Sequence, residues 1–496
     1  MRQNRSVRLP DAMACLVALA GMAVAAADAR GQAPAPTPGL RAGAATANIT
    51  PPLGEPIVGN FATPPATHVH DELHARCLVL DDGATRLAFV VCDSVGVGRE
   101  VFDEARKLAA PASGLPEGNI LAAATHTHSA TSGRSKNMLK PDPLGEYPRF
   151  LARRIADVIR VAVNNLEPAR IGWGAVDVPG PVVNRRWHLK PGREIRNPFG
   201  GIDKVLTNPG RLNPFLLEPA GPTDPQVSFV SVQSRQGKPI ALLANYSLHY
   251  VGGVPNGHIS ADYFAVFGKK IGELLGARDQ DPPFVGIMSN GTSGDANNIN
   301  PREAAKASPP YRQMAEVADE VAKAIAEAHR RVEFRDAVPL AAAHRELALA
   351  TRKPTPEQLD YARKILAKPV DAPKYHPLER VYAERAIAQH ESPDEISVML
   401  QAFRIGDLGI AAIPFEVFAE TGLEIKRDSP FRPTFTMELA NGTYAYLPTP
   451  RHHALGGYET WLGTSKVEVD AAPKIVAALM DLFRQLRSET PSPAKP

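Results

Sequence analysis

Apolar residues along this chain fall into short continuous or alternating runs and into longer stretches with helical spacing. Short runs bounded by turn residues predict strands, and apolar positions recurring every three or four residues predict amphipathic helices. Strands are predicted at 76–81, 86–92, 119–124, 226–234, 239–247, 284–288, 340–350, 396–404, 408–413 and 434–438. Helices are predicted at 101–110, 147–166, 261–275, 311–331, 354–368, 378–390, 416–426 and 472–486.

The order of these elements predicts the fold class. Strands and helices alternate through the body of the chain, and three strand pairs are joined by short turns, such as Asp82-Gly83 and Gly406-Asp407. This arrangement predicts a mixed α/β fold in which layered mixed sheets are flanked by helices. No Pro/Gly-rich linker divides the stretch from about residue 40 to residue 487, so residues 41–487 are predicted to form a single large catalytic domain.

The N-terminus has the pattern of an export signal. Three arginines precede the apolar, Ala-rich run Ala12–Ala27, and small residues follow it. This predicts a signal peptide and the start of a linker in residues 1–33, and a periplasmic or secreted protein; an uncleaved anchor is the alternative. The Pro/Ala linker Gln32–Gly39 and the tail 488–496 are predicted to be disordered. No later run reaches about 18 uninterrupted apolar residues, so no transmembrane segment is expected after signal removal.

Composition narrows the classes of function. The chain has 56 Lys+Arg against 53 Asp+Glu, a formal net charge of +3, which predicts no extended nucleic-acid-binding surface. Its 3 Cys exclude a four-cysteine metal site and a disulfide-built scaffold. Cys77 and Cys92 remain in the mature chain, in apolar strand-like runs. Pairing in an oxidising compartment and burial as two free thiols are both open.

The sharpest candidate for chemistry is the segment Thr125-His126-Thr127-His128-Ser129, which directly follows the predicted strand 119–124. Two histidines at i and i+2 on an extended segment point to the same side. Imidazole is the commonest zinc ligand, so the pair is a candidate metal site. The alternative is a pair of hydrogen-bonded surface histidines.

Four later segments are candidates of the same kind. His249 ends a strand, Glu416 stands where a strand meets a helix, and Tyr446 and Tyr458 lie in a loop rich in Gly and Pro; the small polar loop 290–298 follows the buried strand 284–288. Each also has a structural explanation, namely a core histidine, a charge at a helix start, packing tyrosines or a plain turn. None decides the function alone.

Taken in order, these segments resemble the neutral (non-lysosomal) ceramidases, zinc amidohydrolases that cleave the N-acyl bond of ceramide. The resemblance spans roughly residues 41–487. It is carried by GAATANITP at 43–51, HDELHAR at 70–76, AATHTHS at 123–129, Asn184-Arg185, GKPIALLANYSLH at 237–249, Pro414–Glu416 and the tyrosine loop 446–463.

The resemblance implies a set of site residues. The implied zinc ligands are His126, His249, Glu416 and Tyr446. The residues implied to line the site are His128, as a general base and then acid, and Arg185 and Tyr458, as stabilisers of the oxyanion. The implied protein is an exported Zn²⁺ hydrolase of lipid metabolism, acting on an N-acyl sphingoid-like lipid or a related small molecule.

The chain departs from the family pattern in two places. Asn297 stands where the family carries a functional serine, and it is implied to take that position in the site. The family's enzymes continue into a C-terminal immunoglobulin-like domain, whereas this chain ends just after the predicted helix 472–486. Ester or sugar-linked substrates, and a non-catalytic lipid- or glycan-binding relative, remain as alternatives.

Overall fold

The structure is a computed structural model that describes residues 39–488. All of these residues belong to one compact unit. The predicted signal peptide, nearly all of the linker and the tail beyond residue 488 lie outside the described residues. Among the described residues, no helix is both long and apolar enough to cross a membrane.

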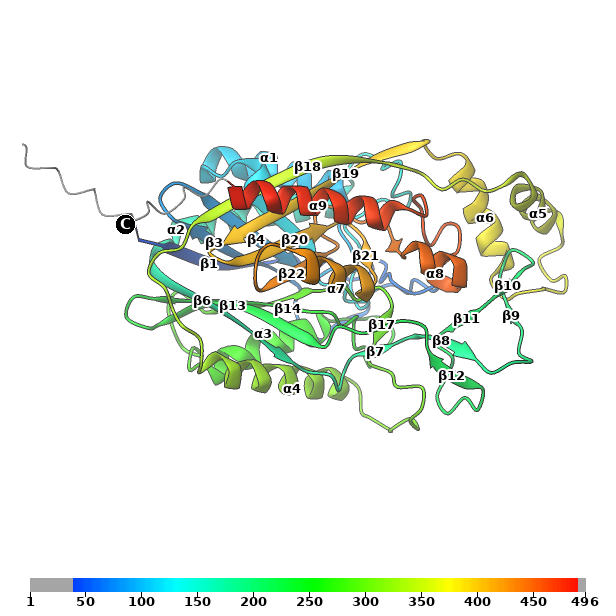
Figure 1. Ribbon diagram of the computed structural model, residues 1–496, viewed down its shortest axis with the longest axis horizontal. Coiled ribbons are helices and arrows are strands. Elements are labelled where there is room, and N and C mark those ends of the chain that lie inside the picture. Colours follow the sequence, from blue (N-terminus) through cyan, green and yellow to red (C-terminus); the bar gives the residue numbers. More distant parts are fainter. Residues whose placement is uncertain (1–38, 489–496) are drawn as a thin grey trace, which may run out of the picture. The chain divides into compact units, whose positions relative to one another are not determined.

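The larger sheet has eight strands in the order β16-β14-β13-β6-β1-β3-β4-β5 (Figure 1). The pairs β14–β16 and β4–β5 are parallel, and the other neighbours are antiparallel. The strands are β1 (Arg41–Asn48), β3 (His74–Asp81), β4 (Arg86–Cys92), β5 (Ile120–Ala124), β6 (Glu167–Asp177), β13 (Gln226–Ser234), β14 (Pro239–Tyr246) and β16 (Val285–Asn290).

A second sheet of four strands packs against the first. Its order is β18-β19-β20-β22, with β20 and β22 parallel. Its strands are β18 (Leu340–Ala350), β19 (Glu395–Ile405), β20 (Leu408–Ile413) and β22 (Thr434–Glu438). An apolar core joins the two sheets, and in it the rings of Phe89 on β4 and Phe403 on β19 lie 5.2 Å apart. Burial of such large apolar surface is the main stabilising term for this layered arrangement.

Helices cover the outer faces of both sheets (Figure 1). The pair α1 and α2 packs beside β1 and β3, the pair α3 and α4 beside β6, β13 and β16, and α7 and α9 cover the small sheet, while α5 packs on α6. The helices are α1 (Arg99–Ser113), α2 (Glu146–Asn164), α3 (Asp262–Leu274), α4 (Arg312–His329), α5 (Pro356–Ala367), α6 (Glu379–His390), α7 (Ala419–Asp428), α8 (Pro450–Leu455) and α9 (Ala471–Ser488).

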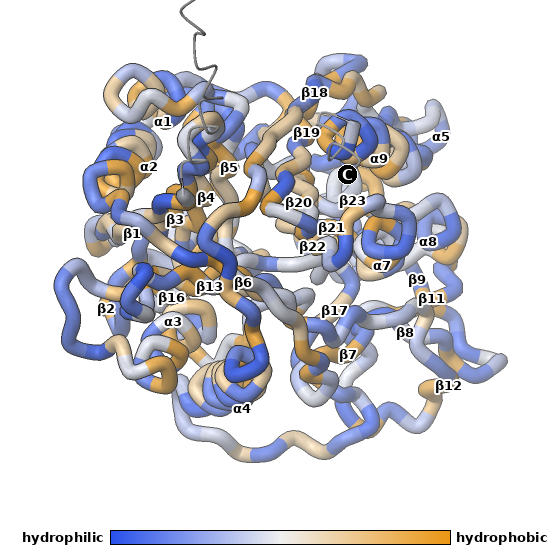
Figure 2. Tube along the Cα trace, turned by 60° about the vertical axis from the view of Figure 1, so that its left-hand side comes forward, coloured by the Kyte–Doolittle hydropathy of each residue, from blue (hydrophilic) through white to orange (hydrophobic). Residues whose placement is uncertain are grey.

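Successive side chains of strand β3 point to opposite faces of the sheet and therefore pack into two different cores. On β3, Cys77 and Val79 face the core under α1 and α2, whereas Leu78 and Leu80 face the core between the sheets. Cys77 and Cys92 are buried and free, so the structure has the two thiols and not the disulfide. Helix α4 is also two-sided, and Figure 2 shows hydrophilic and hydrophobic residues alternating around it.

Short strands tie the loops together. They are β2 (His68–Val69) with β15 (His258–Ile259), β7 (Val183–Asn184) with β17 (Ala296–Asn297), β8 (Arg186–Leu189) with β11 (Val205–Thr207) and β12 (Leu216–Pro219), β9 (Ile195–Arg196) with β10 (Ile202–Asp203), and β21 (Glu416–Val417) with β23 (Tyr446–Leu447). Two 3-10 turns are η1 (Glu117–Asn119) and η2 (Tyr458–Thr460).

The predicted fold class is confirmed, and one element boundary is corrected. The prediction of a helix over 416–426 is wrong at its start, because α7 begins at Ala419 and Glu416 lies in strand β21. The backbone N–H of Glu416 donates to the carbonyl of Ala445 at 2.9 Å, which keeps this segment extended. Strands β1 and β6 were not predicted.

Candidate metal centre and active site

The candidate residues follow the carboxyl ends of strands from both sheets. His126 comes after β5, His249 after β14 and Glu416 after β20, while Tyr446 begins β23. Strands β5, β14 and β20 each have a parallel neighbour, and the loops beyond the carboxyl ends of parallel strands are common positions for ligand sites.

Three imidazoles form a cluster suited to a metal ion. One ring nitrogen from each of His126, His128 and His249 lies within 4.8 Å of the others. The Nε2 atoms of His126 and His128 are 3.1 Å apart, and Oε2 of Glu416 is 3.3 Å from Nε2 of His126. Ligands about 2.0–2.1 Å from a tetrahedral ion lie roughly 3.3 Å from one another, so these spacings fit a metal such as zinc.

His126 is oriented by the backbone around it. Its Nδ1 lies 2.6 Å from the carbonyl oxygen of Val95, which only accepts hydrogen bonds. Nδ1 therefore carries the proton, and Nε2 presents a lone pair to the cluster. The residue has φ of 71°, a left-handed conformation that costs energy outside glycine and is found at functional sites.

His249 is oriented by a short side-chain relay that the sequence did not predict. Its Nδ1 is 3.1 Å from Oγ of Ser293, and that hydroxyl donates to Oε1 of Glu438 at 2.6 Å. Since the hydroxyl has one proton, Ser293 accepts from Nδ1–H of His249. Nε2 of His249 is then free for a metal, and it is a buried atom with no hydrogen-bond partner among the described residues.

Glu438 is the inner end of this relay, at the end of β22. Its Oε2 accepts from the backbone N–H of Val417 at 2.6 Å and of Ser293 at 3.3 Å. Burial raises the pKa of Glu438, and the hydrogen bonds from Ser293 and Val417 oppose that rise. Second-sphere carboxylates of this kind hold ligating histidines in one orientation and one tautomer.

Glu416 and Tyr446 are register partners in the parallel pair β21–β23. Burial acts to raise the pKa of Glu416, but His126, a hydrogen bond from Tyr446 and Arg185 outweigh burial and lower it. Its Oε2 is buried without a hydrogen-bond partner among the described residues, as an atom reserved for a metal would be. Gly294 lies directly behind this strand, where a Cβ would come within 2.7 Å of the Glu416 carbonyl oxygen.

His128 differs from the other two histidines in its surroundings. Its ring stacks on Tyr250 with 3.8 Å between centroids, and its Nδ1 has no hydrogen-bond partner within the described part of the chain. Burial, followed by His126, Arg185 and Arg134, lowers its pKa well below the usual value, so the imidazole is neutral near pH 7. Gly59 leaves room for the ring, because a Cβ there would lie 2.7 Å from His128 Cγ.

Tyr458 and Arg185 lie around Tyr446. Tyr458 lines the cavity beside the cluster, and its ring meets that of Tyr446 edge-on at 5.8 Å. Arg185 is buried behind Tyr446, with its guanidinium carbon 5.4 Å from the ring centroid, and is not among the residues that line the cavity. It is held by Glu459 at 2.8 Å and by the carbonyl of Gly294 at 2.8 Å.

Asn297, predicted to replace the family serine, lies in β17. Its side-chain amide donates to Asn208 at 2.8 Å, and its Oδ1 accepts from the N–H of Ile299. Neither hydrogen bond reaches the histidine cluster, and Asn297 is not among the cavity-lining residues. The residue of this loop whose side chain does contact the cluster is Ser293.

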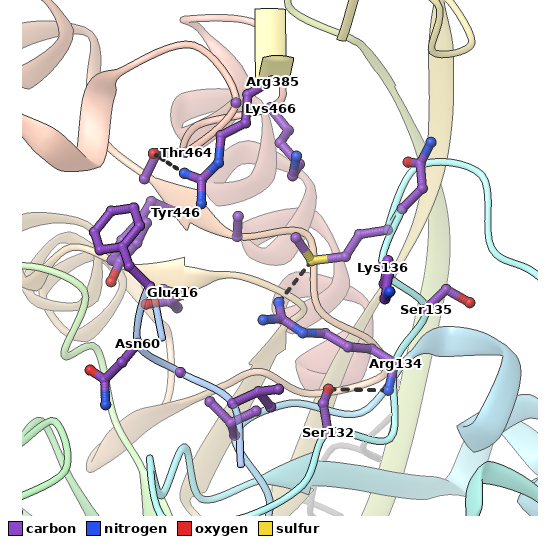
Figure 3. A pocket seen from close by; sticks show the side chains of 18 of the residues that line it. Asn60, Ser132, Arg134, Ser135, Lys136, Arg385, Glu416, Tyr446, Thr464 and Lys466 are labelled. Carbon is purple, nitrogen blue, oxygen red and sulfur yellow. Dashed lines mark hydrogen bonds between the residues drawn. The ribbon is translucent and has the colours of Figure 1, made fainter. Parts of the chain in front are cut away.

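A cavity of about 640 Å³ opens beside the cluster. His126, His128, Glu416, Tyr446 and Tyr458 all line it. Four cationic side chains also line the cavity (Figure 3): Arg134, Lys136, Arg385 and Lys466. The sequence did not reveal this set, because its members come from distant segments.

Comparison with known proteins gives the fold a precedent. No family model matches the chain. A crystal structure of neutral ceramidase from Pseudomonas aeruginosa matches with a TM-score of 0.65 and 18% identity, covering 92% of this chain and 76% of that one. A structure described as ceramidase complexed with C2 matches with a TM-score of 0.66 and 18% identity, covering 92% and 77%. The fold is that of neutral ceramidases.

This likeness confirms the predicted resemblance at the level of fold. The ceramidase-like fold extends over nearly all of the described residues. The buried cluster of His126, His128 and His249 adds a group that can hold a metal ion within it.

Proposed function

We propose that the chain is a zinc-dependent hydrolase that cleaves an N-acyl amide bond. The observation that carries the proposal is the cluster of ring nitrogens of His126, His128 and His249, with Oε2 of Glu416 3.3 Å from Nε2 of His126. Nε2 of His249 and Oε2 of Glu416 are buried without a hydrogen-bond partner among the described residues. The ceramidase-like fold supports the same reaction class.

In this proposal, His126, His249 and Glu416 hold Zn²⁺, and the phenol of Tyr446 is a fourth, weaker ligand. Zinc in such a site polarises the acyl carbonyl and lowers the pKa of a bound water toward neutrality. Tyr446 is kept next to Glu416 by the pairing of β21 with β23 and by its contact with Arg185. Arg185 is thus a positioning residue.

His128 is the proposed proton carrier. Ligating histidines usually have their second nitrogen fixed by a hydrogen bond, as His126 and His249 do here. His128 lacks such a partner for Nδ1, which favours a role in moving protons over a fixed ligand role. As a neutral imidazole it takes a proton from the attacking water at Nε2 and passes it to the leaving amine.

Tyr458 is the proposed donor to the carbonyl oxygen. Tyr458 lines the cavity beside the cluster, and burial raises its pKa, so the phenol keeps its proton. A donor placed where negative charge develops stabilises the tetrahedral intermediate. The basic and apolar N-terminal pattern supports export of the enzyme, as proposed from residues 1–33.

The test compares zinc-loaded wild type with His128→Gln on N-hexanoyl amides, measured by release of the amine. Wild type is expected to cleave at least one amide and to lose turnover when zinc is chelated. His128→Gln is expected to keep its zinc and to lose about 10²–10⁴-fold in kcat, the usual contribution of a general acid–base group.

Two results would contradict the proposal. One is the absence of amine release from every amide by zinc-loaded wild type. The other is turnover that survives complete removal of the metal. If His128→Gln instead loses its zinc together with its activity, His128 is a ligand and the assignment of the proton carrier is wrong.

A further inference from the structure

The cavity beside the metal cluster has an imbalance of charge. Four cationic side chains line it, and Glu416 is the one carboxylate among its lining residues. The carboxylate of Glu416 belongs to the candidate metal centre, where its Oε2 lies 3.3 Å from Nε2 of His126. The cationic side chains therefore face the cavity without an acidic partner in its wall.

These cations have no ion pairs within the described residues. Arg385 donates only to the hydroxyls of Tyr382 at 3.2 Å and Thr464 at 3.3 Å, and Arg134 only to the sulfur of Met138 at 2.9 Å. The buried arginines Arg185 and Arg186, by contrast, are both paired with Glu459. Half-buried cations left unpaired cost free energy that a bound anion would offset.

Three of the cations act on one another. Burial, followed by like-charge repulsion from Arg385 and Arg134, lowers the pKa of Lys466 to about 8. Figure 3 shows Arg385 and Lys466 side by side at one wall of the cavity, with Arg134 entering from another segment of the chain. Their positive potential adds up inside a concave, partly desolvated space, the arrangement that attracts and orients anions.

Two aromatic rings flank the guanidinium of Arg385. Its guanidinium stacks over the ring of Tyr382 at 4.8 Å and lies 5.6 Å from the ring centroid of Phe61. Gly463, with φ of +89°, lets the chain pass close by, because a Cβ there would lie 2.8 Å from Cβ of Arg385. A planar guanidinium held in this way suits carboxylate, sulfonate or phosphate oxygens.

We propose that this hydrolase acts on small N-acyl amides that carry an anionic group, which Arg134, Arg385 and Lys466 bind while the amide lies at the histidine cluster. The proposal rests on the proposed hydrolase function and narrows its substrate class. A neutral two-chain lipid such as ceramide would leave the cations unpaired. The volume of about 640 Å³ is that of a small-ligand pocket.

The test measures binding to the metal-free protein, so that it does not depend on hydrolysis or on anion coordination to zinc. Four probes share one acyl chain: neutral N-hexanoylethanolamine, its O-phosphate, N-hexanoylglycine and N-hexanoyltaurine. Calorimetry is expected to show at least one anionic probe binding 10-fold or more tighter than the neutral probe. The rank of the three anions then identifies phosphate, carboxylate or sulfonate as the preferred group.

Variants locate the effect in the cavity. Arg385→Gln/Lys466→Gln is expected to lose the preference for the anion by 10-fold or more and to keep its affinity for the neutral probe, which reports that the cavity is intact. Lys466→Arg, which keeps the charge, and Lys364→Gln, at an exposed position on α5, are expected to keep the preference. Raising the salt from about 50 to 500 mM is expected to weaken it.

The proposal is overturned if the neutral probe binds as tightly as every anionic probe, or if Arg385→Gln/Lys466→Gln keeps the full preference. The outcome is separable from the proposed function. A preference in the metal-free protein without amide cleavage by the zinc-loaded protein contradicts the hydrolase alone. Cleavage of the neutral amide without any binding preference contradicts only the anionic substrate.

Discussion

Replacing His126 by alanine is expected to reduce bound zinc from about one ion per chain to near zero, because a metal ligand is lost. We expect kcat/KM to fall on the order of 10³-fold, because the metal's several kcal/mol of transition-state stabilisation is lost with it. Nε2 of His126 lies 3.1 Å from Nε2 of His128 and 3.3 Å from Oε2 of Glu416, in the middle of the proposed site. Metal content measured by mass spectrometry after dialysis checks the stoichiometry.

A matched control separates this effect from general damage. His390 is exposed at the end of α6, and His390→Ala is expected to keep both zinc and activity. Circular dichroism compares the fold of the two variants with that of wild type. Zinc bound by His126→Ala at the wild-type stoichiometry and affinity would exclude His126 as a ligand.

The second large effect is expected from a residue that never touches the metal. Ser293→Ala removes the hydroxyl that lies between Nδ1 of His249 and the carboxylate of Glu438. The imidazole then loses the hydrogen bond that fixes its tautomer and orientation. Loss of such a second-sphere partner typically costs about 10–100-fold in metal affinity, and we expect a fall in that range.

Another serine–histidine pair, with a buried serine, provides the control. Oγ of Ser231 lies 2.9 Å from Nε2 of His329, next to helix α4 and outside the cavity lining. Ser231→Ala removes the same kind of hydrogen bond and is expected to leave zinc affinity unchanged, as measured by competition with a chelator of known affinity. Equal zinc affinities of Ser293→Ala and wild type would show that the relay does not tune His249.

The local spacing of apolar and turn residues was enough to predict most of the longer helices and strands. The hairpin β13–β14 was predicted at 226–234 and 239–247, with Gly237 supplying the positive φ of its turn. Strand β1 was missed because RAGAATAN is made of small residues with weak strand preference, and its pairing with β3 makes it a strand. Strand β6, which contains Pro168 and two glycines, is likewise extended by its pairing with β13.

The candidate site also contains residues that local sequence could predict and residues that it could not. His126 and His128 stand out in the sequence because two histidines at i and i+2 share one side of an extended segment. The relay to His249 was not predictable, since Ser293 lies in the loop after β16 of the larger sheet and Glu438 ends β22 of the smaller sheet, and the two meet only through the fold. The cationic side chains of the cavity could not be predicted for the same reason. Arg385 lies on a helix, whereas Arg134 and Lys466 lie outside the helices and strands.

The proposed function requires that His126, His249 and Glu416 hold a single metal ion with Tyr446 beside it. Anomalous diffraction from crystals of the zinc-loaded protein at the zinc absorption edge tests this claim most directly. The proposed site predicts one peak within about 2.0–2.3 Å of Nε2 of His126, Nε2 of His249 and a carboxylate oxygen of Glu416. A peak elsewhere, or no peak among these atoms at full zinc loading, would contradict it.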